Sequence, residues 1–156
     1  PENHFEELKG RGRRDDRASR SGPGGAGTAL QNRVLIDAPE DRYGYFLVRE
    51  LESQLGRAST PAWGLALTTT TSEDGLAIDS EGNTRRYNLL GTTSYALRDL
   101  SSGQIVTSGK VESFTGYSAT GTTVATRAAE LDAQERLMAI LADLIVSRLY
   151  AADLSE

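Results

Sequence analysis

Cysteine is absent from this chain of 156 residues, and histidine occurs only once, at His4. The missing cysteine excludes disulfides, thiol nucleophiles, cysteine-ligated zinc and iron–sulfur clusters. No apolar run approaches the about 18 residues that a membrane-spanning helix needs, so the chain is not expected to cross a bilayer. Together these absences leave few routes to covalent or metal chemistry.

The remaining composition is that of an ordinary globular domain. Hydrophobic residues make up 38% of the chain and charged residues 25%, and the length suits one domain with its own core. The net charge of −5 disfavours a general attraction to nucleic acid or to an anionic membrane. An anionic ligand would therefore have to be met by a local cluster of arginines.

The first 27 residues differ from the rest. They contain six of the 17 basic residues and little apolar content, and they end in the glycine-rich stretch 21–27. Such a stretch forms neither a helix nor a packed strand. It also lacks the apolar segment of an intact signal peptide. We expect a disordered leader, or a segment added in cloning, over residues 1–27 and a single folded domain over residues 28–156.

The domain opens with a strand and a helix. A short β-branched run predicts a strand over residues 33–37. Asp41 is a suitable N-cap for a helix over residues 42–57, in which apolar residues recur at three- and four-residue steps. Gly56 is expected to end this helix.

Three further strands are predicted at residues 63–71, 85–98 and 104–117, where Thr, Tyr, Val and Leu alternate with a period of two. Ser and Thr fill most of one face, which indicates a sheet covered on one side only. Residues 99–103 predict a tight hairpin with Gly103 at positive φ. Residues 72–83 are expected to be a polar excursion, with a turn at Asp74-Gly75 and a short strand at residues 76–78.

A long helix is predicted over residues 123–152, and its buried stripe is expected to pack on the sheet. The stripe comprises Val124, Ala128, Leu131, Met138, Leu141, Ile145 and Leu149, widened by Leu137, Ile140 and Leu144. The predicted fold class is α+β, with two helices on one face of a four-stranded, mainly antiparallel sheet in the order β-α-β-β-β-α.

The motifs that could carry catalysis are weak. The folded part has no histidine for a nucleophile–base pair. Residues 22–27 match G-x-G-x-x-G by letter, but they precede the first strand and no helix follows them. Residues 79–83 resemble a calcium loop but lack its glutamate at the twelfth position. The pairs Glu40-Asp41 and Glu73-Asp74 suit a helix start and a turn. We expect no catalytic residue, no cofactor and no metal, and therefore a protein that is not an enzyme.

Arginines offer the main binding feature. Arg85 and Arg86 begin one predicted strand, and Arg127 lies near the start of the long helix. Neighbouring residues on a strand point to opposite faces, so at most one of the pair can face a given ligand. Two interpretations stay open: solvated charges paired with acidic residues, or contacts to a phosphate or carboxylate, which the planar guanidinium suits.

The ordered motifs resemble those of a known family. They are Val34–Ala38, Tyr43-x-x-x-Leu47-x-x-x-Leu51, Thr84–Leu89, Tyr95–Asp99 with Gly103, and the helix from Ala128 to Leu149. In order and spacing, over about residues 23–152, they resemble the lipopolysaccharide (LPS)-assembly lipoprotein family LptE.

This resemblance implies a protein lipid-anchored on the periplasmic face of the outer membrane of Gram-negative bacteria. It further implies that the protein plugs the lumen of the β-barrel LptD, aids the folding of that barrel and helps pass LPS to the outer leaflet. The family's LPS-binding basic residues fall here at Arg85 or Arg86 and near Thr126-Arg127, which makes Arg127 the candidate on the long helix. Members of the family begin at a lipidated cysteine, which this chain lacks, so the anchor is only implied. An alternative is a structural lipoprotein subunit of another envelope secretion or transport machine, without a lipid ligand.

Overall fold

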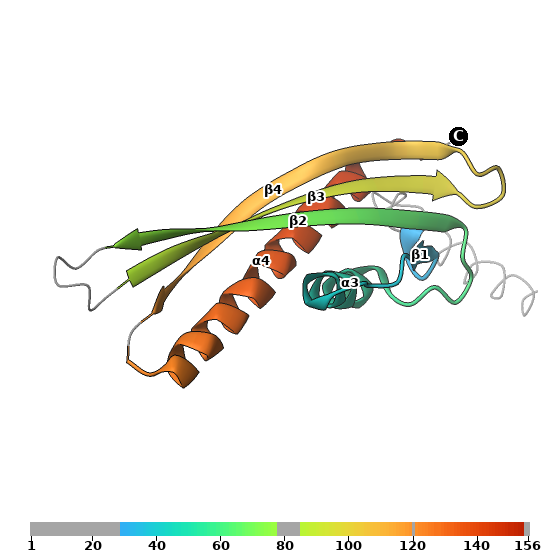
Figure 1. The fold of residues 1–156 in the computed structure, drawn as a ribbon. Coiled ribbons are helices and arrows are strands. Elements are labelled where there is room, and N and C mark those ends of the chain that lie inside the picture. Colours follow the sequence, from blue (N-terminus) through green and yellow to red (C-terminus); the bar gives the residue numbers. More distant parts are fainter. Residues whose placement is uncertain (1–28, 78–84, 120, 155–156) are drawn as a thin grey trace, which may run out of the picture.

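The computed structural model describes residues 29–77, 85–119 and 121–154. Its elements are β1 (Val34–Ile36), α3 (Arg42–Leu55), β2 (Trp63–Ala77), β3 (Arg85–Asp99), β4 (Ile105–Ala119) and α4 (Thr123–Ala151). The strands form one sheet in the order β1-β2-β3-β4, in which only β1 and β2 are parallel. Both helices lie on the same side of the sheet (Figure 1). The predicted α+β fold is confirmed. The leader and the motifs at residues 22–27 and 79–83 lie outside the described residues.

The short helix α3 has the predicted ends. The Asp41 carboxylate accepts a hydrogen bond of 2.8 Å from the backbone N–H of Gly44, which satisfies one of the free donors of the first turn. Gly56 ends the helix at φ 78°, a conformation that glycine adopts without strain. Three leucines of its inner face, at four-residue spacing, are fully buried: Leu47, Leu51 and Leu55.

Strand β2 is longer than predicted. Asp74-Gly75 is not a turn, because β2 continues to Ala77 and pairs with β3 along its whole length. Gly75 lies opposite Tyr87, whose ring covers it so closely that a Cβ at position 75 would come within 3.1 Å of the ring. The glycine therefore makes room for a cross-strand aromatic side chain instead of bending the chain.

The hairpin between β3 and β4 follows the prediction. The Asp99 carboxylate accepts hydrogen bonds from the backbone N–H and the hydroxyl of Ser101, and Gly103 has a φ of 78°. These hydrogen bonds hold the pKa of the Asp99 carboxyl below its usual value. The strands that leave the hairpin are antiparallel, with one register shift at Leu97/Arg98.

Fewer residues of α4 are buried than its apolar sequence pattern predicted. The second half supplies core residues such as Leu137, Leu141 and Ile145, but Val124 is 79% exposed, and more than a third of both Ile140 and Leu144 is exposed. The prediction was wrong at these positions because the helix periodicity does not show which neighbours cover it. Ala128 and Leu131 are not buried either.

A second element covers only the later part of α4. Arg49 and Gln54 of α3 bond to Glu135 and Asp143 of α4, which places α3 alongside the second half of the long helix. Within the described part of the chain, the earlier turns lie beside the sheet and not beside α3 (Figure 1). Among the described residues, no helix is both long enough and apolar enough to cross a bilayer.

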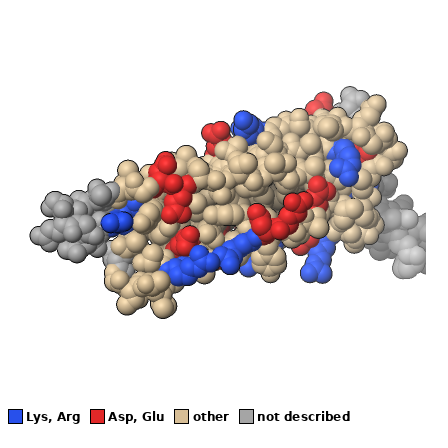
Figure 2. All heavy atoms as spheres, viewed as in Figure 1, with Lys and Arg blue, Asp and Glu red and all other residues tan. Residues whose placement is uncertain are grey.

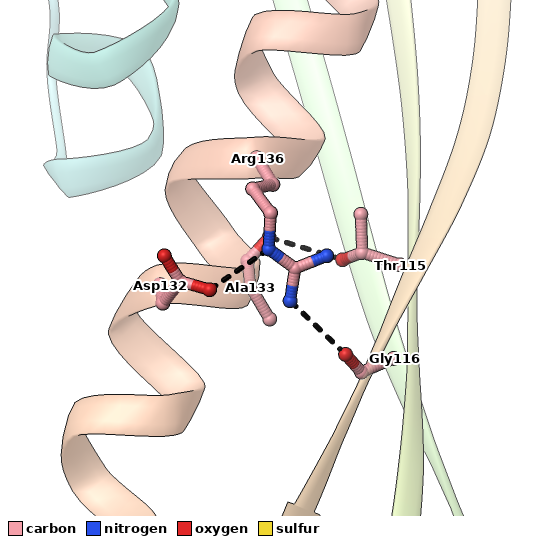
Figure 3. A network of polar contacts seen from close by, with 5 residues as sticks. All are labelled: Thr115, Gly116, Asp132, Ala133 and Arg136. Carbon is pink, nitrogen blue, oxygen red and sulfur yellow. Dashed lines mark hydrogen bonds and ion pairs between the residues drawn. The ribbon is translucent and has the colours of Figure 1, made fainter.

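Polar contacts fix the position of α4 on β4 (Figure 3). The buried hydroxyl of Thr115 donates to the backbone carbonyl of Ala133 at 3.0 Å. Arg136 donates to the Asp132 carboxylate at 2.8 Å and to the backbone carbonyl of Gly116 at 3.2 Å. These bonds link neighbouring residues of one strand to successive turns of the helix, so they set its position along the strand.

We expect Leu141→Ala to lower the free energy of unfolding by about 2–5 kcal/mol, since it leaves a cavity in the core. Val124→Ala, on the same predicted stripe but exposed, should change it by less than about 0.5 kcal/mol. Urea denaturation of both variants measures the difference. Equal losses would contradict the burial pattern of α4.

Candidate ligand-binding site

A hollow of about 360 Å³ lies where β3 begins, β4 ends and α4 begins. It is lined by Arg85, Tyr87, Ala119, Gly121, Thr122, Thr123 and Thr126. The lining thus includes one arginine and three threonines beside a tyrosine, which gives the hollow a polar character. Such groups offer hydrogen-bond donors to an anionic ligand.

The start of α4 adds further donors to this hollow. Gly121 turns the chain at φ 74°, and the Thr122 hydroxyl caps the helix by accepting a 3.1 Å hydrogen bond from the N–H of Ala125. The first N–H groups of a helix have no partners within the helix and carry its partial positive charge. They reinforce the preference of Arg85 for an anion.

An aromatic pair supports the hollow. The rings of Tyr87 and Tyr117 stack with centroids 5.1 Å apart, and the Tyr117 hydroxyl donates to the Glu73 carboxylate at 2.8 Å. Burial and this bond to a negatively charged group raise the pKa of Tyr117 well above its ordinary value. Through these contacts the stack links β2, β3 and β4 next to Arg85.

The three predicted arginines do not meet in one place. Arg85 lines the hollow, whereas Arg86, on the opposite face of the sheet, lies 3.5 Å from the Ser118 hydroxyl. Arg127 forms an exposed ion pair of 2.9 Å with Glu130 and is not part of the lining. As alternation along the strand predicted, only one of the neighbouring arginines faces this hollow. Thr122 and Thr123 were not predicted as site residues, although a Thr pair before a helix is a capping signal.

A second hollow, of about 230 Å³, lies between the β1–α3 connection and β2. Its lining includes the carboxylates Asp37, Glu40 and Asp41 beside Leu47 and Leu67. These carboxylates would repel an anion, and Asp41 is already engaged as the helix cap. Among the described residues, no three His, Cys, Asp or Glu side chains gather closely enough to hold a metal ion.

Charges on the helix side occur mainly as pairs. Three ion pairs, Arg49–Glu135, Arg127–Glu130 and Arg136–Asp132, lie on the exposed sides of α3 and α4. Basic and acidic side chains accordingly lie beside one another in the view of Figure 2, and no broad face of one sign is visible there. This view therefore shows no broad basic face that could bind an anion.

With two helices on one side of a four-stranded sheet, this chain has the architecture of bacterial lipoproteins of known structure. A candidate lipoprotein from Caulobacter crescentus CB15 superimposes with a TM-score of 0.68 at 26% identity, over 81% of this chain and 93% of the other. A minor lipoprotein from Acinetobacter baumannii gives 0.59 at 14% identity, over 78% and 94%. The rare lipoprotein B from Shewanella oneidensis gives 0.53 at 16% identity, over 75% and 91%.

A family match makes the assignment specific. The chain belongs to the LptE family, described as lipopolysaccharide-assembly, which matches residues 31–149. The matched range extends from just before β1 to the last turn of α4, so it includes the sheet, both helices and the Arg85 hollow. The resemblance seen in the sequence motifs is confirmed. No curated protein gives a significant sequence match.

We expect Glu73→Gln to lower the pKa of Tyr117, because it removes the carboxylate charge that disfavours tyrosinate. An alkaline titration of tyrosinate absorbance should then show its last tyrosine ionising at lower pH than in the wild type. Glu112→Gln, on the exposed opposite face of the sheet, is the matched control and should leave the curve unchanged. An unaltered titration of Glu73→Gln would refute the contact.

Proposed function

We propose that this protein is an outer-membrane LPS-assembly subunit that occupies the lumen of an LptD-type β-barrel. There it helps the barrel assemble and assists the transfer of LPS to the outer leaflet. It acts by binding, without catalysis. Membership of the LptE family supports this role, since the match spans nearly the whole described domain.

The observation that carries the proposal is the polar, uncovered face of the sheet. Away from the helices, the strands present mainly hydroxyl and charged side chains, including Thr68, Thr70, Ser72, Ser94, Lys110 and Glu112, all exposed. The three strands that carry this face are each 15 residues long, so it offers an extended surface to a partner. The interior wall of an outer-membrane barrel is polar, so a polar sheet face is a suitable surface to lie against it.

The Arg85 hollow supports a contact with LPS phosphates. Phosphate oxygens accept hydrogen bonds from a guanidinium, from hydroxyls and from the N–H groups at a helix start, and all three kinds of donor meet here. Arg127 lies outside the lining, and its charge is partly compensated by its ion pair with Glu130. Arg86 faces away from the hollow. We therefore assign the central contact to Arg85.

We infer a location on the periplasmic face of the outer membrane, held in the native protein by an N-terminal lipid. Lipoproteins of the same fold support this location. The sequence contains no cysteine to carry such a lipid.

Co-expression with an LptD-type barrel should yield a co-purifying complex. Thr70→Trp/Ser94→Trp, which adds bulk to the uncovered sheet face, should lower the yield of the complex at least tenfold. Ser147→Trp, at an exposed site on α4, should leave it within twofold. The plug role fails if the wild-type chain does not co-purify with the barrel.

The affinity for LPS should depend on Arg85 and not on its neighbour Arg86. Arg85→Glu should weaken binding about tenfold or more, the effect expected for a lost hydrogen bond to a charged group. Arg86→Glu makes the same charge change on the other face and should have little effect. Isothermal titration with LPS measures both. If neither variant alters binding, the alternative gains support: a structural lipoprotein subunit of another envelope machine.

A further inference from the structure

One row of residues on the uncovered sheet face differs from the rest. At the end of the sheet nearest the β3–β4 hairpin, the register places Leu35, Gly64, Arg98 and Ile105 side by side across all four strands. Leu35 is 52% exposed and Ile105 is 64% exposed. Two large apolar side chains thus flank an arginine on open surface.

Gly64 completes this arrangement by carrying no side chain. A Cβ at position 64 would lie 3.1 Å from the guanidinium carbon of Arg98 and 3.1 Å from a methyl group of Leu100. Arg98 and Leu100 therefore lie over the glycine, close to the sheet. Leu100 is itself more than a third exposed. We call Leu35, Arg98, Leu100 and Ile105 the end patch.

The rest of the uncovered face contrasts with the end patch. The next row holds Ala66, Ala96 and Ser108, and the row after it holds Thr68, Ser94 and Lys110. Large exposed apolar residues reappear toward the other end of this face, where Leu76 pairs with Arg86 and Leu90 pairs with Phe114. The Leu76 row continues past Arg86 to Ser118, so among the described rows it is the end patch in which two large apolar side chains lie on either side of an arginine.

The described chain enters the domain at this same end. The Ala29 carbonyl accepts a hydrogen bond of 3.1 Å from the Trp63 indole N–H, and Trp63 begins β2 next to Gly64. Arg33 precedes β1 and is exposed, and its carbonyl accepts from the N–H groups of Ala62 and Trp63. β1, the first described strand, lies at the same end of the sheet as the β3–β4 hairpin (Figure 1). The N-terminal side of the domain, where a lipoprotein is tethered, is therefore at the end that carries the end patch.

We propose that the end patch contacts the surface of a bilayer that contains anionic phospholipid. Leu35, Leu100 and Ile105 reach the boundary between headgroups and acyl chains, while Arg98 and Arg33 pair with lipid phosphates. The hairpin contributes one carboxylate, Asp99, and that group is turned into the hairpin by its bonds to Ser101. The local charge balance thus favours an anionic surface although the whole chain carries −5.

The expected affinity is low. The membrane affinity that three partly exposed apolar side chains and two arginines provide should be comparable with that of one acyl chain, which binds reversibly. Such a contact is useful chiefly alongside another attachment, because it then fixes the orientation of the domain on the membrane. The inference does not depend on the LPS-assembly role, since the vesicle test below contains neither barrel nor LPS.

The test is flotation of the full chain with phosphatidylethanolamine/phosphatidylglycerol vesicles at millimolar lipid. The wild type should float, and phosphatidylcholine vesicles should retain several-fold less. Ile105→Ser and Arg98→Gln should each reduce the bound fraction at least fivefold. Phe114→Ser, which alters a similarly exposed residue (66%) in the middle of the same face, is the matched control and should stay within twofold.

Three outcomes would overturn the proposal. The first is a wild-type chain that does not float with anionic vesicles. The second is an equal loss for Ile105→Ser and Phe114→Ser, which would indicate a general stickiness of the sheet. The third is a patch variant that floats normally but loses co-purification with a barrel, since the end patch would then be a protein interface. All substituted side chains are at least partly exposed, and circular dichroism confirms that each variant is folded.

Discussion

Burial of apolar side chains on one face of the sheet is the constraint on which the rest of this structure depends. Along β3, Leu89, Tyr95 and Leu97 point toward the helices, and every alternate residue points away. A slip of one residue in the pairing would bury Ser94 and expose Leu97. The register of the long strands is therefore set by the helices, which cover only one face.

This constraint also produces the two features that we interpret functionally. Since the helices need only one face, the other is free to carry hydroxyls and charges, and it does so over most of its length. The strands also continue past the region where α3 and α4 both pack. At the end of the sheet where β3 begins and β4 ends, the start of α4 lies far enough from the strands to leave the Arg85 hollow. The stacked rings of Tyr87 and Tyr117 pack beside this hollow.

Local signals predicted much of this fold, and long-range contacts account for the errors. Asp41 and Gly56 mark the ends of α3 in the sequence because caps act on the nearest turn. Asp74-Gly75 has the same local appearance as a turn, yet pairing with β3 keeps it in a strand, and only the position of Tyr87 explains the glycine. The stripe of α4 has helical period throughout, but whether Val124 or Leu141 is buried depends on where α3 lies.

The candidate site shows the same division between local and long-range information. Alternation along a strand sufficed to predict that Arg85 and Arg86 face opposite sides. It could not show that Thr122, Thr123 and Thr126 would come to lie beside Arg85, because that depends on how α4 leaves the end of β4. The end patch escaped prediction for a similar reason, as its four residues come from three separate parts of the chain and meet only through the sheet register.

The two proposed contact sites lie far apart along the sheet. Arg85 and Arg98 lie near opposite ends of β3, on the order of 40 Å apart at about 3.3 Å per residue. The hydrocarbon core of a bilayer is about 30 Å thick. If the end patch lies on the periplasmic leaflet and the strands run upright within a barrel, the Arg85 hollow lies near the level of the opposite leaflet. A rigid sheet is well suited to hold this separation, because its length is set by paired backbones and does not depend on a flexible linker.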